Sequence, residues 1–287
     1  MIPLGNQLFI QKKHNFMKIS FKKSFLLFSS FFLGAIVFTL FFSVQVHAQK
    51  GRILKVMAYN IHHANPPSKS DFIDIEAIAK VIMAVDPDMV ALQEVDVNTK
   101  RSGVDLNQAK ELAMLTEMNY YFEPSIPFQG GGYGNAILSK FPIEEKFFYQ
   151  LSAEPGTEPR AVLAIQVTLP GKRKVKFAST HLDFSGGANT AQQAIDVTSY
   201  FKKEKLPVII AGDFNAVVDS DAINVMDNGF ERTCTGECPP TIPVNNPKKA
   251  IDFIFFKSKK VFTVKHHEVI SETYASDHLP IFAILVY

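Results

Sequence analysis

Three hydrophobic stretches of this chain each end in side chains that can bind a cation or a phosphate. The polar residues that follow them are, in chain order, Asn60, Glu94 and the pair Asp213 and Asn215. A strand that ends in such a residue holds a polar group at the rim of a sheet, and burying several carboxylates there costs several kcal/mol each unless a cation compensates them. Hard oxygen ligands suit Mg²⁺, and also Mn²⁺ or Ca²⁺. The pattern predicts a divalent-metal site.

Each of these residues, taken alone, also fits an ordinary structural role. An Asn after a strand is typical of a turn, a single Glu is usually solvated, and Asn215 also fits a helix cap after a turn at Gly212 and Asp213. A shared site is favoured only by the order of these residues along the chain and by the other motifs that accompany them.

Seven short motifs follow one another between residues 53 and 287. They are Met57–His62, Leu92–Asp96, Tyr133–Lys140, Ser179–Leu182, Gly212–Asn215, Ile251–Ile254 and Ser276–Pro280. In this order they resemble the endonuclease/exonuclease/phosphatase superfamily, which includes DNase I-like nucleases, abasic-site endonucleases, neutral sphingomyelinases and inositol-polyphosphate phosphatases. The residues of these motifs look most like those of secreted bacterial members.

The resemblance implies a role for each site residue. Glu94 resembles the principal metal ligand, assisted by Asn60 and Asp277. His278 resembles the residue at the scissile phosphate, as general base or transition-state stabiliser, and Asp252 resembles the group that orients its ring.

Four further residues complete the implied site. Asp213 and Asn215 resemble the pair that orients the attacking water and holds a phosphate oxygen or a second metal. His181 is similar to a second histidine that protonates the leaving oxygen or binds the phosphate, and Arg160 lies where many members place a phosphate-binding arginine. The expected reaction is in-line attack of water on a phosphoester.

The roles of three residues near these motifs stay open. His62 follows Asn60 by two residues, so either a role in lining the site or a simple polar rim position fits it. Lys248 and Lys249 precede Ala250, whereas many relatives place a basic residue directly before the pair that corresponds to Ile251 and Asp252, which leaves substrate contacts there undecided.

Strand-like and helix-like segments alternate along the chain. The expected strands are Ile53–Tyr59, Met89–Leu92, Asn135–Ser139, Ala161–Leu169, Val175–Thr180, Val208–Ala211, Ile251–Phe256, Val261–Val269 and Ile281–Val286. The expected helices are an amphipathic one from Phe72 to Val85, ending before Pro87, and the segments Gln108–Met118 and Ala188–Lys203. A turn at Pro170 and Gly171 predicts a hairpin.

This alternation and the resemblance predict the same α/β (α+β) fold. It is a four-layer DNase I-like sandwich, in which two mixed β-sheets pack face to face with helices outside. We expect one domain over residues 49–287, because no linker or repeat interrupts the pattern after Arg52.

Residues 1–48 read as an export signal. Lysines precede an uncharged run from Ser24 to Val46, and Val46-His47-Ala48 offers a cleavage site before Gln49. The run is also long enough for an uncleaved membrane anchor, and Met17 is an alternative start to Met1. We expect an exported protein, periplasmic, extracellular or on the outer surface.

The charge balance changes when this segment is removed. The chain has 30 basic and 28 acidic residues, and residues 1–48 hold five lysines and no acid, so 25 basic and 28 acidic residues remain, a net charge of −3. A domain of this sign lacks the broad basic footprint of tight, nonspecific nucleic-acid binders.

Cys234 and Cys238 are the two cysteines of the chain. In an oxidising compartment they fit a small disulfide-closed loop, and free thiols are the alternative. A zinc site is disfavoured, because a structural zinc site needs about four ligands and the nearest histidines, His266 and His267, lie in a different strand-like segment.

The expected function is hydrolysis of a phosphoester in a lipid headgroup or another small molecule, by a monomeric enzyme. The alternative within the same chemistry is a secreted nuclease acting on DNA or RNA. A noncatalytic binding module of the same fold is the third reading, and the filled catalytic positions argue against it. Membrane association through the N-terminal segment or a lipid substrate remains open.

Overall fold

The computed structural model describes residues 51–258 and 260–287, so the predicted export signal lies outside the described residues. Within the described residues, twelve strands form two six-stranded sheets. The first sheet has the order β11 (Thr263–Val269), β12 (Ile281–Val286), β1 (Ile53–Asn60), β2 (Met89–Val97), β4 (Gly131–Ser139) and β3 (Asn119–Phe128). The second has the order β5 (Glu145–Gln150), β6 (Ala161–Leu169), β7 (Arg173–His181), β8 (Val208–Asp213), β10 (Asp252–Lys257) and β9 (Glu231–Arg232).

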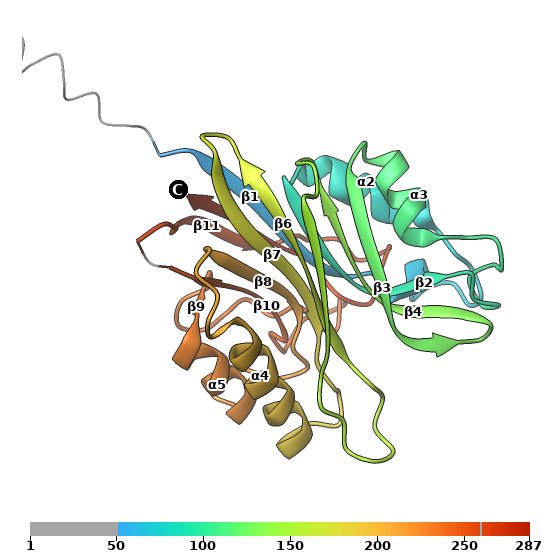
Figure 1. The fold of residues 1–287 in the computed structure, drawn as a ribbon. Helices are drawn as coiled ribbons and strands as arrows, with labels where there is room; N and C mark the ends of the chain where they lie inside the picture. The colour runs from blue at the N-terminus through green and yellow to red at the C-terminus, as the bar shows by residue number, and fades with distance from the viewer. Residues whose placement is uncertain (1–50, 259) are drawn as a thin grey trace, which may run out of the picture. The chain divides into compact units, whose positions relative to one another are not determined.

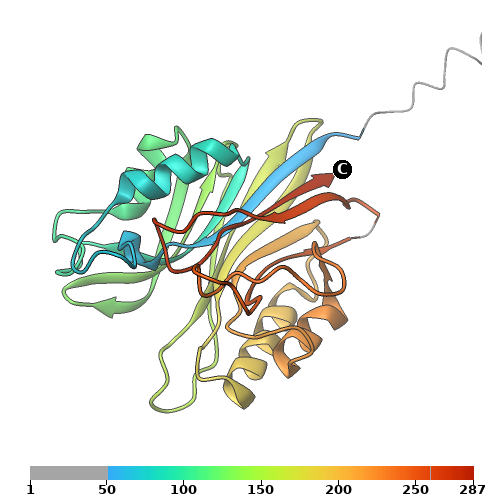
Figure 2. The ribbon, with the colours of Figure 1, turned by 180° about the vertical axis from the view of Figure 1, so that it is seen from behind.

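The two sheets pack face to face, and helices cover their outer faces (Figures 1 and 2). Helices α2 (Ile75–Val85) and α3 (Gln108–Leu115) lie on the first sheet, and α4 (Gly187–Phe201) and α5 (Asp221–Gly229) lie on the second. A short 3-10 helix, η1 (His62–Ala64), follows β1. The expected four-layer α/β sandwich is therefore confirmed.

Strand β1 shows how one sequence serves two cores. Its even-numbered residues, Leu54, Val56 and Ala58, pack between the sheets, whereas Met57 and Tyr59 pack against the helices. Successive side chains of a strand point to opposite faces, so a strand covered on both sides reads as continuously hydrophobic.

The helix ends have local causes. Asp74 accepts a hydrogen bond from the backbone nitrogen of Ala77 and caps the start of α2. The same helix ends at Asp86, which adopts a left-handed conformation directly before Pro87. Asn107 and Ser220 cap α3 and α5 in the same way as Asp74. None of the helices in the described ranges is long and apolar enough to cross a membrane.

All nine expected strands and all three expected helices are present, and the hairpin at Pro170 and Gly171 joins β6 to β7. The sequence patterns missed β3, β5, the two-residue β9 and helix α5. Both β3 and β5 are edge strands. Most residues of β5 are exposed, and β3 is mostly half-buried and contains Pro124 and Pro127, so neither shows clear hydrophobic alternation.

Candidate active site

The alternation that builds the inner core also aims polar side chains into the space between the sheets. In β8, Ile209 and Ala211 face the opposite sheet, and Asp213 continues their face. Asp252 likewise shares the face of Ile254 in β10. Because the side-chain period of a strand is two residues, the polar ends of these strands follow their hydrophobic residues inward.

Sheet register then aligns three of these groups. His181 of β7 is paired with Asp213 of β8, and Asp213 is paired with Asp252 of β10. All three are buried, with exposed fractions of 5%, 2% and 4%. Two carboxylates and an imidazole therefore lie side by side on three neighbouring strands.

Glu94 reaches the site through a break in strand β2. The pairing of β2 with β4 shifts register between Leu92 and Val95, and Glu94 within this bulge has a φ of 57°. Such bulges re-aim a side chain. The side-chain nitrogen of Asn60 lies 3.0 Å from Oε1 of Glu94 and 3.1 Å from Oδ2 of Asp213, so one amide joins the two sheets.

The loop Ser276–Pro280 brings His278 in from the far end of the chain. The hydroxyl of Ser276 donates to the backbone oxygen of Asn60 over 2.7 Å, which fixes this loop to the end of β1. His278 Nδ1 lies 3.0 Å from Oδ2 of Asp252, and its Nε2 lies 3.7 Å from Oδ2 of Asp213.

His181 is held between an arginine and a carboxylate. Arg160 Nη1 lies 3.0 Å from His181 Nδ1, and because a guanidinium can only donate, Nδ1 is the acceptor. Nε2 lies 3.5 Å from Oδ2 of Asp213, which can accept a proton, and 3.0 Å from the side-chain nitrogen of Asn215, which can only donate. The contact with Arg160 favours the tautomer that carries its proton on Nε2, toward Asp213.

Arg160 is itself buried, with 4% exposure, and pairs with Glu158 over 2.8 Å. Its Nε is buried and has no hydrogen-bond partner within the described part of the chain. A buried donor without a partner costs free energy. A phosphate oxygen bound here would satisfy that donor and would use the planar guanidinium in the way such groups bind phosphate.

The two histidines titrate in opposite directions. Burial lowers the pKa of His278, but the charges of Asp252 and Asp213 outweigh burial and raise that pKa to about 10. Burial, followed by the charges of Arg160 and His278, lowers the pKa of His181 well below its ordinary value. At neutral pH the site therefore holds one imidazolium and one neutral imidazole.

The carboxylate of Asp213 lies next to both histidines, and its pKa is raised. Burial and the neighbouring charge of Asp252 raise its pKa to about 7. A carboxyl group that titrates near neutrality is suited to accept a proton from water.

The donor set fits a divalent cation. Donor atoms of Asp213, Asp252 and His278 lie within 4.8 Å of one another. His278 Nδ1 already pairs with Asp252, and a cation between them would break that contact. Oε1 of Glu94, which Asn60 holds, is a further carboxylate donor at the site. The buried carboxylates and oxygen-rich donors suit a hard metal ion.

The structure brings together nearly all of the expected site residues. Hydrogen bonds or ion pairs link Asn60, Glu94, Arg160, His181, Asp213, Asn215, Asp252 and His278. Asp277 lies beside His278, where its charge helps to raise the pKa of that residue, and its carboxylate is 3.5 Å from the hydroxyl of Ser276.

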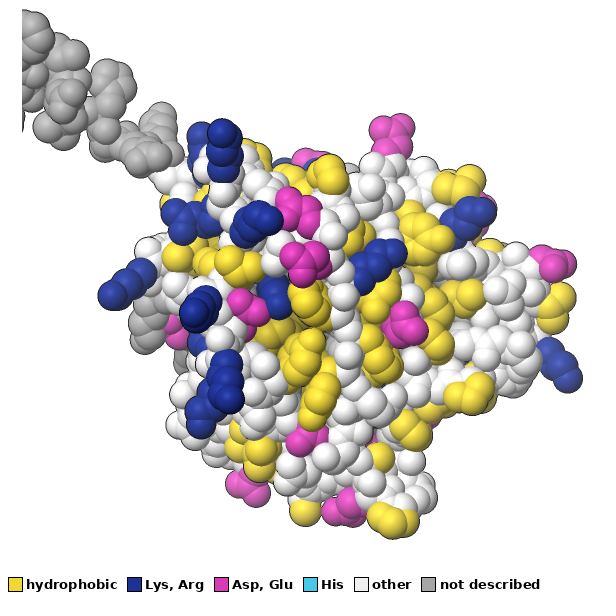
Figure 3. Space-filling model, in the orientation of Figure 1, with side chains coloured by type: hydrophobic (Ala, Val, Ile, Leu, Met, Phe, Trp, Pro, Cys, Tyr) yellow, Lys and Arg dark blue, Asp and Glu magenta, His cyan; other side chains and the backbone are white. Residues whose placement is uncertain are grey.

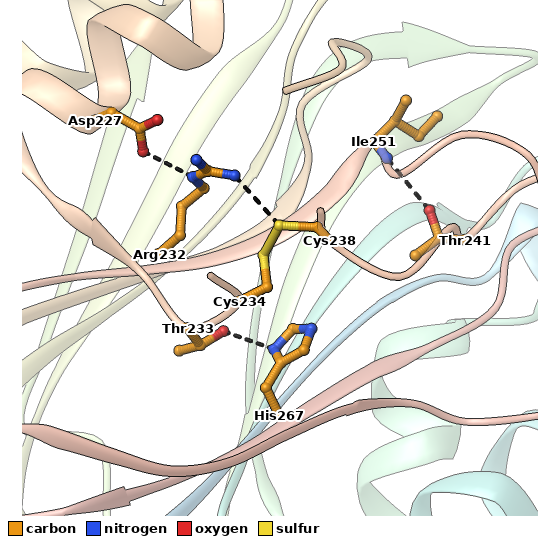
Figure 4. Close-up of a disulfide and its surroundings, with 8 residues drawn as sticks. All are labelled: Asp227, Arg232, Thr233, Cys234, Cys238, Thr241, Ile251 and His267. Carbon is orange, nitrogen blue, oxygen red and sulfur yellow. Dashed lines mark hydrogen bonds and ion pairs between the residues drawn. A yellow bond between two sulfur atoms is a disulfide. The ribbon is translucent and has the colours of Figure 1, made fainter. Parts of the chain in front are cut away.

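The sequence patterns missed Thr241. Its buried hydroxyl donates to Oδ2 of Asp252, and its backbone oxygen accepts from the nitrogen of Leu279 over 2.8 Å. Thr241 follows the loop closed by a disulfide between Cys234 and Cys238 (Figure 4). It is a lone threonine among prolines in the sequence, so no local signal marks it.

A second missed group connects the sheets beneath the site. Gln93 is fully buried and donates to the hydroxyl of Ser179 over 2.9 Å, and Ser179 donates to the backbone oxygen of Leu92 over 3.0 Å. Both residues lie inside quoted motifs, but their contact crosses 86 positions of the chain and is visible only in the fold.

Comparison with known proteins agrees with this geometry. A model of the Endonuclease/Exonuclease/phosphatase family matches residues 57–278. The uncharacterized protein YbhP of Escherichia coli is 26% identical over 243 residues, covering 80% of this chain and 94% of that protein.

Two solved structures show the same fold. An endonuclease/exonuclease/phosphatase from Beutenbergia cavernae has a TM-score of 0.66 at 25% identity and covers 82% of this chain and 72% of its own. A family protein from Bacteroides thetaiotaomicron has a TM-score of 0.71 at 22% identity and covers 83% of this chain and 98% of its own.

Proposed function

The chain belongs to the endonuclease/exonuclease/phosphatase family, whose members hydrolyse phosphoesters, and on this premise we propose that it is a divalent-metal-dependent hydrolase of a small or lipid-linked phosphoester. One observation carries the proposal: two buried histidines, one protonated and one neutral, both lie next to the buried carboxylate of Asp213.

The residues divide the work of in-line hydrolysis. Asp213, with a pKa of about 7, accepts the proton of the attacking water. The His278 imidazolium, oriented by Asp252, stabilises negative charge on the phosphoryl oxygens. Arg160 binds the same phosphate through its free Nε, and the Nε2 proton of His181, which faces Asp213, is available to protonate the leaving oxygen or to bind the phosphate.

Glu94, Asn60 and Asp277 are the residues that would hold the cation. When bound, the cation would supply further positive charge to the developing phosphoryl transition state. Mg²⁺ is the first candidate because carboxylate and amide oxygens make up the donor set, and Mn²⁺ or Ca²⁺ fit the same ligands.

Charge distribution favours a small or lipid-linked ester over nucleic acid. Once residues 1–48 are removed, 25 basic residues remain against 28 acidic ones, a net charge of −3.

On the face drawn in Figure 3, Lys and Arg side chains gather mainly toward the side where the described chain begins, with acidic side chains among them. This supports a small or lipid-linked ester over nucleic acid, whose nonspecific binding depends on a broad basic surface.

The first experiment measures hydrolysis of bis(p-nitrophenyl) phosphate with Mg²⁺, with EDTA, and in the variants Glu94→Ala and His278→Ala. We expect turnover to require the metal and to be lost in both variants. Matched controls are Glu76→Ala in α2 and His266→Ala in β11, because both side chains are exposed and lie outside the site network. Undiminished turnover in EDTA and in both site variants would exclude the mechanism.

A second experiment separates the substrate classes. Hydrolysis of sphingomyelin and of phosphoinositides in vesicles is compared with nicking of supercoiled plasmid at equal enzyme concentration. We expect lipid or small-ester hydrolysis to dominate, whereas efficient plasmid nicking with no ester hydrolysis would identify a nuclease.

We also propose that the catalytic unit works outside the cytoplasm. The disulfide between Cys234 and Cys238 supports this proposal, because disulfides persist in oxidising compartments. N-terminal sequencing of the mature protein tests it, with Gln49 as the expected first residue. An intact N-terminus on protein recovered from the cytoplasm would contradict it.

A further inference from the structure

Asp96 organises the loop between β2 and α3 around one arginine. Its carboxylate is fully buried and accepts from the hydroxyls of Thr99 over 2.8 Å and Ser102 over 2.6 Å. Arg101 adds two more bonds, from Nε over 2.7 Å and from Nη2 over 3.0 Å. Four donors therefore hold one carboxylate, and the pair with Arg101 is bidentate.

Aromatic rings fix the same guanidinium from the side. Cζ of Arg101 lies 4.5 Å from the ring centroid of Phe128 and 5.2 Å from that of Tyr133. The backbone nitrogen of Arg101 also donates to the side chain of Gln129 over 2.8 Å. A long side chain normally loses rotamer freedom when it binds a ligand, and here that freedom is already restricted before binding.

Tyr133 connects this arginine to the active site. One face of its ring is near Arg101, and its hydroxyl end interacts with Arg160, the expected phosphate ligand. Burial, followed by the charge of Glu94, raises the pKa of Tyr133, so its hydroxyl stays protonated. Tyr133 thus interacts with both guanidinium groups, and the charge of Glu94 acts on both Arg101 and Tyr133.

Arg101 keeps donors that the described protein groups do not use. A guanidinium has five N–H groups, and the hydrogen bonds from Nε and Nη2 to Asp96 occupy two of them. The Nη1 group has no acceptor among residues 51–258 and 260–287, and 29% of the side chain is exposed. The arginine is held firmly yet remains open to solvent on one side.

We infer that Arg101 forms a second anion-binding subsite, which selects a substrate with another phosphate or carboxylate a few bonds from the scissile phosphoester. This inference rests on the proposed phosphoester hydrolysis. Arg160 would hold the reacting phosphate, and the free donors of Arg101 would bind the second anionic group across Tyr133.

The test uses two chromogenic esters that differ by one phosphate: thymidine 5′-(p-nitrophenyl phosphate) and its 3′-phosphorylated form. With Mg²⁺, we expect the wild-type enzyme to prefer the second ester by about tenfold or more in kcat/KM, as a charge-assisted contact allows. Arg101→Gln should abolish this preference. Arg173→Gln, an exposed arginine of β7, is the matched control and should keep it.

A binding measurement separates this inference from the proposed function. Calorimetric titration of thymidine 3′,5′-bisphosphate and thymidine 5′-monophosphate should show tighter binding of the bisphosphate to the wild type and equal binding to Arg101→Gln. If neither ester is hydrolysed, the proposed function fails, and this titration alone decides the subsite.

Two results would overturn the inference. One is that the wild type shows the same kcat/KM for both esters and the same affinity for both nucleotides. The other is that Arg101→Gln lowers these values by the same factor for both members of each pair, which would indicate a purely structural arginine. If Arg101→Gln does not fold, Arg101→Lys takes its place, because lysine keeps the positive charge but loses the planar set of N–H donors of the guanidinium. That variant should retain less of the preference than the wild type.

Discussion

His278 Nδ1 lies 3.0 Å from Oδ2 of Asp252, although the two residues are 26 positions apart and come from a loop and a strand. The contact fixes the ring so that Nε2 points toward Asp213, at 3.7 Å. A carboxylate in this position orients the imidazole and stabilises its protonated form.

Replacing that carboxylate should therefore reduce catalysis more than stability. We expect Asp252→Asn to lower kcat on bis(p-nitrophenyl) phosphate by roughly a hundredfold to ten-thousandfold, with a small change in KM. Steady-state kinetics measures this split. Asp227→Asn, at an exposed ion pair with Arg232, is the control and should keep wild-type kcat. A loss confined to KM would contradict the assigned role.

The raised pKa of His278 predicts a pH-dependent stability. Because the folded-state pKa is about 10 and the ordinary value is 6.5, the protonated ring stabilises the fold fully below pH 6.5, and this contribution is lost as pH rises toward 10. In EDTA, the Tm difference between wild type and His278→Gln should be larger at pH 6 than at pH 9.5. The exposed His266→Gln variant is the control. A difference that grows with pH would show the opposite sign.

Thr241 should act by positioning Asp252. Thr241→Val keeps the shape but removes the hydroxyl that donates to Asp252, and we expect kcat to fall about tenfold. Thr241→Ser restores the hydroxyl and should recover most of the activity. If serine and valine behave alike, the hydroxyl is not the group that matters.

Arg160 should bind phosphate through the shape of its guanidinium. Arg160→Lys keeps one positive charge but loses the planar fork, so KM should rise by about tenfold on a phosphoester substrate. Inorganic phosphate, used as a competitive inhibitor, should weaken in parallel. Arg173→Lys on the exposed part of β7 is the control. Unchanged KM and phosphate inhibition would remove Arg160 from the binding site.

Gly212 is required where three strands approach closely. A Cβ there would lie 1.9 Å from the backbone oxygen of Thr180, and the residue has a φ of 154°. We expect Gly212→Ala to destabilise the protein by about 1–3 kcal/mol and to displace Asp213. Thermal unfolding measures the effect. Gly229→Ala, where the nearest neighbouring atom is 3.7 Å away, should cost much less.

The sequence alone determined the hydrophobic strands, their polar ends and the family. These signals are local: the strand period places Asn60, Asp213 and Asp252 on the inner face of their strands, and short motifs preserve the types of the site residues. Edge strands such as β3 and β5 were missed because exposure weakens the hydrophobic pattern that identifies a strand.

Only the tertiary structure decided how these groups interact. The register of β7, β8 and β10 aligns His181, Asp213 and Asp252, and a bulge in β2 turns Glu94 toward Asn60. The opposite pKa shifts of the two histidines also depend on burial and on partners far away in the chain. Local sequence carries no information on such distances, because long-range packing sets which charges meet in a buried site.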